Sequence, residues 1–348
     1  LGPRTARELL TTFGLPEAIF EAGFPALVRV VPEALAEVLA QPAAPAVRAS
    51  IDATEHWLAD EQHALLTLAD AEYPQALLMT ADPPPVLFAV GRVALLNRPS
   101  IAIVGSRNAT RHGAETASAF ARAVAEAGVT VVSGLALGID AAAHRGALAA
   151  DSDASTIAVV GTGVDVIYPA SNKALTHEVR KRGLIVSEFP LRMPAIAHNF
   201  PRRNRIIAGI TRGTLVVEAA LRSGSLITAR LAAECGREVL AIPGSIHSPL
   251  SKGCHRLIRD GAKLVESALD VLEEIGLAPR SGVDAFDAPM EPSAHADLLA
   301  LMGHEPVDLE RLVERSGREP GELVGALLEL ELAQHVERLP GNRYQRLR

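Results

Sequence analysis

The chain has 348 residues, of which 48% are hydrophobic and 22% charged, and its formal net charge is -7. This length and a mean hydropathy of +0.19 exclude wholesale disorder, because such a chain can bury at least one large core. Uncharged stretches such as 127–139 are shorter than the roughly 18 to 20 residues that a membrane-spanning helix needs. The first residues lack the apolar segment of a secretory signal. We therefore expect a cytoplasmic protein with no membrane span.

Cysteine and histidine usage argues against disulfides and metal sites. Only Cys235 and Cys254 occur, and they form no CxxC pair. The 11 histidines include no HxxxH pair with a third plausible ligand. The P-loop pattern GxxxxGK[ST] is absent and the dinucleotide pattern GxGxxG is incomplete. The sequence thus predicts no metal and no cofactor.

The charge is distributed unevenly along the chain. Residues 1–99 carry 6 basic and 12 acidic residues, whereas residues 170–270 carry 16 basic and 8 acidic ones. An excess of base confined to one region indicates an anion-binding face, although an ordinary arginine-rich surface would give the same counts.

The first part of the chain reads as a small module followed by two strands. Residues 1–50 predict short helices, of the SAM or helix-hairpin kind, because Gly14, Gly23 and Pro32 interrupt the apolar pattern. An Ala- and Pro-rich run follows at 41–46. Apolar runs at 64–68 and 86–90, separated by prolines, predict two strands that lead into the main domain.

Residues 51–277 predict one large α/β domain. Buried-strand patterns that alternate with segments of helix length begin at Ile101, Val129, Thr156, Leu184, Thr214, Glu238 and Ala262. Continuous apolar strands that alternate with helices are typical of a doubly wound, mostly parallel sheet of the Rossmann-like kind. In that architecture we expect ligands at the carboxyl ends of the strands.

The last part predicts a linker at 278–295 and a winged-helix (DML1-like) domain at 296–348. Three amphipathic segments precede two short strands around Gly341 and Asn342, a typical hairpin turn. The third helix carries Glu319, Glu322, Glu329 and Glu331, where a DNA-reading helix would carry Arg, Lys, Asn or Gln. We favour a protein-interaction or dimer-contact role over duplex reading, and both remain open.

Basic and small residues recur at the predicted strand ends. Gly105, Ser106 and Arg107 follow the first core strand, and Lys173 lies in YPASNK at a helix entry. The segment HNFPRRNRIIAG places three guanidinium groups around a helix start, which predicts an anion opposite them, and Phe200 offers a stacking face for a base. The predicted nucleic-acid contacts are Gly105, Ser106, Arg107, Lys173, Phe200, Arg202, Arg203, Asn204, Arg205, Ser223, Gly224 and Ser225.

Three further polar residues receive structural interpretations. We expect Asp140 to cap the helix that follows it and His144 to pack against a neighbouring turn, since no nucleophile pattern accompanies either residue. We expect Glu218 to orient one of the arginines rather than to act as an acid or base. No catalytic residue is predicted.

The blocks IAIVGSR, VVSGLALGIDAAAHRGAL, GTGVDVIYP, NFPRRNRIIAG, VVEA with SGSLITA, and AIPG resemble the DprA/Smf family of DNA-processing proteins, over about residues 51–277. The resemblance implies a non-enzymatic, dimeric protein that binds single-stranded DNA without sequence preference, protects it and loads the RecA recombinase during natural transformation. It also implies pairing of two copies through the Rossmann-like domain, and a DNA pocket that includes Arg107, Lys173 and the arginine cluster.

Two alternatives belong to other classes of protein. Enzymes of the same Rossmann-like superfamily bind nucleotides or cleave their N-glycosidic bonds, using a PGGxGT block and a nearby glutamate. This sequence lacks the PGGxGT block, but Glu218 is a candidate for the glutamate. A structural scaffold whose basic patch meets an acidic protein is the third possibility, and weak salt dependence of DNA binding would favour it.

Overall fold

A computed structural model describes residues 2–277, 295–303, 306–333 and 335–347. The chain divides into two compact units, up to residue 285 and from residue 286, and each is described by itself. The predicted linker at 278–295 lies outside the described residues except for His295. Among the described residues, no helix is long and apolar enough to cross a membrane.

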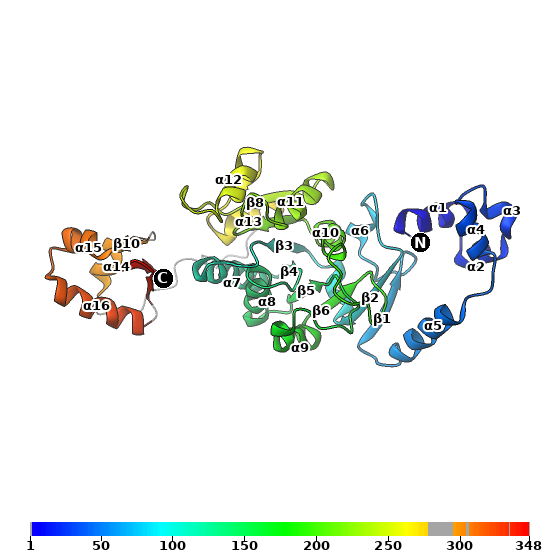
Figure 1. Cartoon of the computed structure of the whole chain (residues 1–348), viewed down its shortest axis with the longest axis horizontal. Helices are drawn as coiled ribbons and strands as arrows, with labels where there is room; N and C mark the ends of the chain where they lie inside the picture. Colours follow the sequence, from blue (N-terminus) through cyan, green and yellow to red (C-terminus); the bar gives the residue numbers. More distant parts are fainter. Residues whose placement is uncertain (1, 278–294, 304–305, 334, 348) are drawn as a thin grey trace. The chain divides into compact units, whose positions relative to one another are not determined.

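The large unit is built on a nine-stranded sheet in the order β1-β2-β6-β5-β4-β3-β7-β8-β9. Its strands are β1 (His63–Thr67), β2 (Val86–Gly91), β3 (Ser100–Val104), β4 (Thr130–Ser133), β5 (Thr156–Val159), β6 (Leu184–Ser187), β7 (Gly213–Val216), β8 (Glu238–Ala241) and β9 (Lys263–Leu264). Figure 1 labels all of these strands except β7 and β9. The β1–β2 and β2–β6 pairs are antiparallel and the other pairs are parallel. The predicted doubly wound, mostly parallel sheet is confirmed.

Helices cover both faces of the sheet because the inner strands are apolar on both sides. One face packs against α7 (Arg111–Glu126), α8 (Ile139–Ala149) and α13 (Ala268–Glu274). The opposite face packs against α6 (Gln75–Leu78), η1 (Val93–Asn97), α10 (Asn199–Ile210), α11 (Ser225–Glu234) and α12 (Lys252–Arg259). Helix α9 (Lys173–Arg182), which follows η2 (Ala170–Asn172), packs beside β5 and β6.

The N-terminal helices have a small core of their own. They are α1 (Pro3–Phe13), α2 (Pro16–Glu21), α3 (Phe24–Leu27) and α4 (Glu33–Leu39), and their buried side chains include Leu9, Leu27 and Leu39. Helix α5 (Pro45–Trp57) buries none of its residues. The domain boundary predicted between residues 50 and 51 lies inside α5.

The C-terminal unit has the winged-helix plan that the sequence predicts. Its elements are α14 (Ala296–Met302), β10 (Val307–Asp308), α15 (Leu309–Ser316), α16 (Pro320–Leu332), β11 (Val336–Leu339) and β12 (Arg343–Arg346). The three strands pair antiparallel in the order β10-β12-β11. The hairpin turn at Gly341 and Asn342 has φ values of 84° and 56°, which are typical of this pair of residue types.

Candidate nucleic-acid interface

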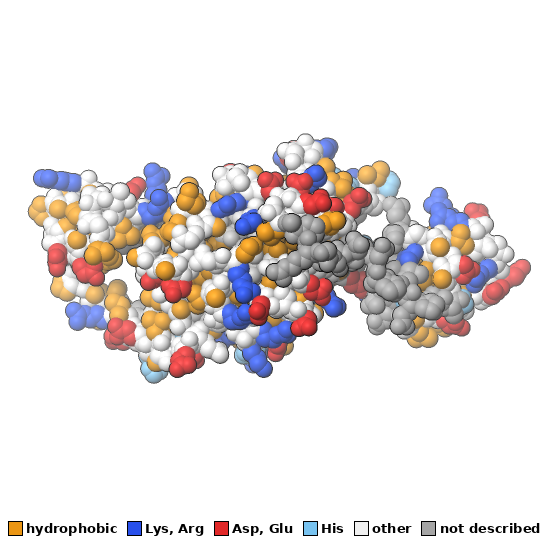
Figure 2. Space-filling model, turned by 180° about the vertical axis from the view of Figure 1, so that it is seen from behind, with side chains coloured by type: hydrophobic (Ala, Val, Ile, Leu, Met, Phe, Trp, Pro, Cys, Tyr) orange, Lys and Arg blue, Asp and Glu red, His pale blue; other side chains and the backbone are white. Residues whose placement is uncertain are grey.

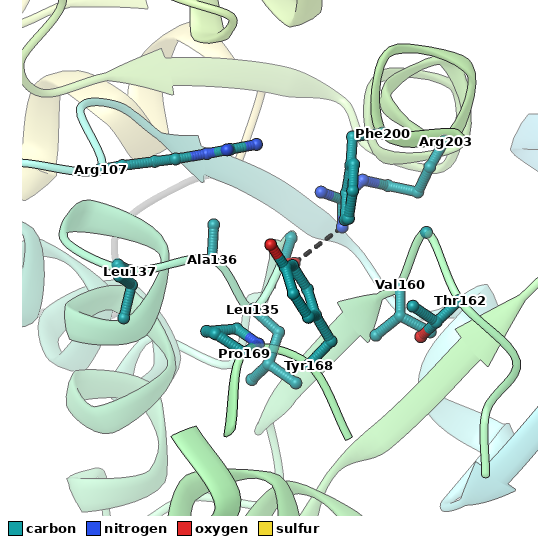
Figure 3. A pocket seen from close by; sticks show the side chains of 12 residues that line it. Arg107, Leu135, Ala136, Leu137, Val160, Thr162, Tyr168, Pro169, Phe200 and Arg203 are labelled. Atoms are coloured by element: carbon teal, nitrogen blue, oxygen red, sulfur yellow. Dashed lines mark hydrogen bonds between the residues drawn. The ribbon is translucent and has the colours of Figure 1, made fainter. Parts of the chain in front are cut away.

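A pocket lies at the carboxyl ends of β3, β4 and β5, where the loops that leave these strands meet the start of α10 (Figure 3). We call it the strand-end pocket. Its lining residues are Arg107, Gly134, Leu135, Ala136, Leu137, Val160, Gly161, Thr162, Tyr168, Pro169, Phe200 and Arg203.

The opening of the strand-end pocket combines one cation with two aromatic rings. The Arg107 guanidinium carbon lies 5.7 Å from the centroid of the Phe200 ring, and the Tyr168 ring lies 5.5 Å from Phe200 at a tilt of 36°. Arg107 is exposed and makes no ion pair with any described residue. The three side chains converge around the opening (Figure 3), so a charged and a flat group can be bound together there.

Tight packing of the loop after β3 fixes the position of Arg107. A Cβ added to Gly105 would lie 2.6 Å from the Ile139 side chain, so only glycine fits. Ser106 is buried, and its hydroxyl accepts a hydrogen bond from the Asn108 amide at 3.1 Å. Gly105 and Ser106 therefore shape the loop, whereas Arg107 projects from it.

The carboxylate of Glu218 fills the expected nucleotide site. The connections from β3 and β7 leave in opposite directions, and the crevice between two such strands is where doubly wound proteins bind nucleotides. Here Glu218 accepts hydrogen bonds from the Thr110 amide at 2.9 Å and from its hydroxyl at 2.6 Å, at the start of α7. A Cβ at Gly113 would lie 2.3 Å from this carboxyl group. The prediction that Glu218 orients an arginine is wrong, because it binds the N-cap residue of α7.

Arg203 forms a buried cationic floor beneath the strand-end pocket. It is 3% exposed and donates to the carbonyl oxygens of Gly134, at 2.7 Å, and Val159. Burial lowers the pKa of Arg203 to about 10, while the Asp140 carboxylate opposes this shift, so the guanidinium stays charged at neutral pH. A Cβ at Gly134 would lie 2.6 Å from the Arg203 guanidinium, so a larger residue at this position would clash with it.

Asp140 and His144 hold the loop after β4 in place. Asp140 accepts from the amides of Gly134 at 3.1 Å and Ala136 at 3.4 Å, and it makes no helix cap, so the predicted capping role is wrong. His144 is buried, accepts from the Leu135 amide at 3.3 Å and contacts the Thr156 hydroxyl at 2.7 Å. Burial lowers the pKa of His144 to about 3. The packing role predicted for His144 is confirmed.

Two further arginines of α10 face anions supplied by the protein itself. Arg202 and Arg205 both bind the buried carboxylate of Glu188, and Arg205 also donates to the Asp82 carbonyl oxygen at 2.7 Å. Burial raises the pKa of Glu188, and the two arginines oppose this shift. The Arg202 side chain remains 40% exposed. The anion that the sequence predicts opposite this cluster is therefore partly internal.

The other predicted contact residues lie around the same edge of the sheet. Lys173 is exposed at the start of α9 and makes no ion pair within the described part of the chain. Its neighbour Asn172 donates to the carbonyl oxygens of Leu135, at 3.0 Å, and Ala136, at 3.3 Å, which ties α9 to the pocket loop.

Asn204 and the loop after β7 do not line the strand-end pocket. Asn204 accepts from Arg203 at 3.2 Å. Ser223 and Ser225 share a hydrogen bond of 2.7 Å at the start of α11, next to the exposed Gly224.

Other charges of the basic segment are also paired locally, as in Arg230–Glu234, Arg256–Asp260 and Lys263–Glu274. On the face seen in Figure 2, Lys and Arg side chains lie among Asp and Glu side chains rather than forming one continuous basic surface. Lys181 and Arg222 are also exposed and make no ion pair among the described residues, so what sets the strand-end pocket apart is that its exposed Arg107 lies beside two aromatic rings.

Comparison with known proteins identifies the family. A family model described as DNA recombination-mediator protein A matches residues 64–276, and a second, the DprA winged helix domain, matches residues 284–342. The chain belongs to the DprA/Smf family. The sequence is 42% identical to Protein Smf of Escherichia coli over 309 residues, which cover 86% of this chain and 82% of that protein. It is 48% identical to DprA of Streptococcus pneumoniae over 208 residues, 60% of this chain and 73% of that protein.

Solved structures of DprA proteins share this fold. The Streptococcus pneumoniae structure has a TM-score of 0.61 and 39% identity, and the match covers 78% of this chain and 97% of that one. DNA processing protein A of Helicobacter pylori, whose structure concerns its single-stranded DNA binding mode, has a TM-score of 0.55 and 30% identity over 61% of this chain and 94% of that one. The family resemblance inferred from the sequence is confirmed.

Proposed function

We propose that this DprA/Smf protein binds single-stranded DNA without sequence preference in the strand-end pocket. The observation that carries the proposal is the open group of Arg107, Phe200 and Tyr168, in which the cation has no ion-pair partner among the described residues. An unpaired guanidinium matches a phosphate in charge and geometry, and the aromatic rings stack on any base. Lys173 and Arg202 extend the cationic edge on which neighbouring phosphates bind.

Recognition of this kind is independent of sequence. The pocket offers a charge and ring faces, whereas the floor donors of Arg203 are already bound to backbone carbonyl oxygens. Few polar groups remain to read the edges of bases, so stacking and phosphate contacts dominate. This supports the binding of any exposed single strand that enters during DNA uptake.

The protein acts by holding DNA rather than by catalysis. We propose that two copies pair through the Rossmann-like domain, protect the bound strand and load RecA onto it during natural transformation and recombination. A nucleotide hydrolase is disfavoured because Glu218, the candidate acid, is hydrogen-bonded to Thr110 at the place where a nucleotide phosphate would lie. A nucleotide phosphate at this helix start would be repelled by the negative charge of the Glu218 carboxylate.

The test is fluorescence anisotropy of a labelled oligothymidine titrated with the full chain at several salt concentrations, beside a duplex of equal length. Steeply salt-dependent binding that prefers the single strand is expected. Absence of binding at low salt, or equal binding of both DNAs, would refute the proposal.

A RecA ATP-hydrolysis assay on DNA covered by a single-strand-binding protein tests loading separately, and a shorter lag before hydrolysis is expected. Release of free base from nucleotides would restore the hydrolase alternative.

A further inference from the structure

Helix α16 of the winged-helix domain exposes an apolar face. Val324, Leu328 and Leu332 are 44%, 54% and 77% exposed, although large aliphatic side chains on a helix of a small domain normally face its core. The core is already filled from the opposite side of the helix by Leu323, Leu327 and Leu330. The exposed leucines and valine are therefore not a displaced part of the described core.

Two glycines lie on the same face. At about 100° per residue, Gly321 and Gly325 fall with Val324, Leu328 and Leu332 in one arc of about 100°. We call these five residues the α16 stripe. A Cβ added to either glycine would meet nothing within 4 Å, so no neighbour within the described domain requires the missing side chains. Glycine inside a helix is destabilising relative to alanine, and close approach of another backbone is a physical reason for it.

Acidic residues flank the α16 stripe on both sides. Glu322 and Glu329 lie along one edge and Glu331 along the other, by the same helical spacing. Glu329 pairs with His295 at 2.9 Å, but its side chain remains 70% exposed. A DNA backbone laid on this face would meet like charges. A second α16 would place glutamates against glutamates in either direction, because the flanks of paired helices face each other.

We propose that the α16 stripe is the docking surface for an amphipathic helix of a partner protein, whose own apolar stripe carries Lys or Arg on both flanks. Such a helix would bury the valine and leucines, approach closely over the two glycines and pair with the three glutamates. This interaction is independent of DNA binding in the strand-end pocket. The winged-helix domain would thus bind a partner helix whose charge is opposite to that of α16.

The probe is a pair of synthetic 18-residue helical peptides that share one stripe of Leu and Ala and carry either Lys or Glu at both flanks. Binding of each labelled peptide to the full chain is followed by fluorescence anisotropy. We expect the Lys peptide to bind at least tenfold more tightly than the Glu peptide, with the difference shrinking as salt is added. Equal binding of the two peptides, or no binding of either, overturns the proposal.

Two variants distinguish a loss of peptide binding from a loss of the folded domain. Leu328→Glu should weaken binding of the Lys peptide at least tenfold, with Arg311→Ala on α15 as the exposed control. Gly325→Ala should raise the thermal midpoint of the winged-helix domain and still weaken peptide binding, because the added methyl group blocks close approach. Unchanged peptide affinity in both stripe variants overturns the proposal. Duplex DNA binding, or self-association of the chain, that is lost in Leu328→Glu also overturns it.

Discussion

The strand-end pocket and the α16 stripe lie in the two different domains of this DprA/Smf protein, and their surfaces differ in charge. The pocket presents Arg107, which has no ion-pair partner among the described residues, beside two aromatic rings, whereas the stripe presents exposed aliphatic side chains between glutamates. The fold alone therefore does not identify a DNA-binding surface. What distinguishes the two regions is the charge of their exposed side chains, which is positive at Arg107 and negative along the edges of the α16 stripe.

The largest expected effect concerns the floor of the strand-end pocket. Arg203→Ala should lower the free energy of unfolding by about 3 to 5 kcal/mol, because it leaves two buried carbonyl oxygens without their donor and removes the positive charge that stabilises the buried Asp140 carboxylate. Urea-induced unfolding followed by circular dichroism measures this loss. Arg107→Ala is the matched control and should change stability by less than about 0.5 kcal/mol. A stable Arg203→Ala protein that merely binds DNA less well would show that the floor is not a fixed part of the fold.

Acid should destabilise the loop after β4 through His144. Its pKa is about 3 in the folded protein and 6.5 as the ordinary value, so between these pH values the unfolded state binds a proton that the folded state does not. Stability is therefore lost as the pH falls below 6.5, by about 1.4 kcal/mol per pH unit from this group alone.

The measurement is urea-induced unfolding at pH 7, 6, 5.5 and 5 for the parent chain and for His144→Gln, which cannot titrate in this range. The difference between the two free energies of unfolding should shrink as the pH falls, since only the parent chain loses the contribution of a neutral imidazole. Parallel curves for the two proteins would rule out His144 as the source of acid sensitivity.

The opening of the pocket should affect DNA affinity rather than stability. Arg107→Ala should weaken oligothymidine binding about tenfold, or about 1.4 kcal/mol, and reduce the salt slope by about 0.7 because one phosphate contact is lost. Arg122→Ala on α7 is the control, since Arg122 is exposed and paired with Glu126 at 2.7 Å. Equal loss in both variants would indicate a nonspecific effect of net charge.

The sheet could be predicted from the sequence because its signals are local. Continuous apolar runs predict β3, β4 and β5, and the glycine and asparagine at 341 and 342 predict the wing hairpin. Arg107 and Phe200 were also predicted, since a cation after a strand and an aromatic at a helix start are visible in the sequence. They meet in the pocket because the carboxyl ends of parallel strands share one edge of the sheet.

The partners of these residues could not be predicted, because they come from distant parts of the chain. Arg205 contacts Asp82 from 123 residues away, and Glu218 contacts Thr110 from 108 residues away. Single-sequence patterns contain no signal for such pairs. Tyr168 was missed although its motif was singled out for Lys173; an aromatic residue in a polar loop directly before Pro169 was the available signal.

The smallest expected effect on DNA affinity is that of deleting the winged-helix domain. Deletion of residues 292–348 should change the affinity for oligothymidine by less than about threefold, or about 0.7 kcal/mol, because the glutamates of α16 disfavour phosphates and the strand-end pocket lies wholly in the other unit. Fluorescence anisotropy at fixed salt measures the affinity of the truncated protein. The Arg107→Ala full chain, measured alongside, provides the loss of affinity with which it is compared. A loss in the truncated protein as large as that in Arg107→Ala would mean that the wing hairpin, with its exposed Arg338 and Arg343, binds the strand despite the acidic helix. The charge of the exposed side chains on α16 would then be a poor guide to the domain as a whole, and the contrast between the two regions would hold only for the helix.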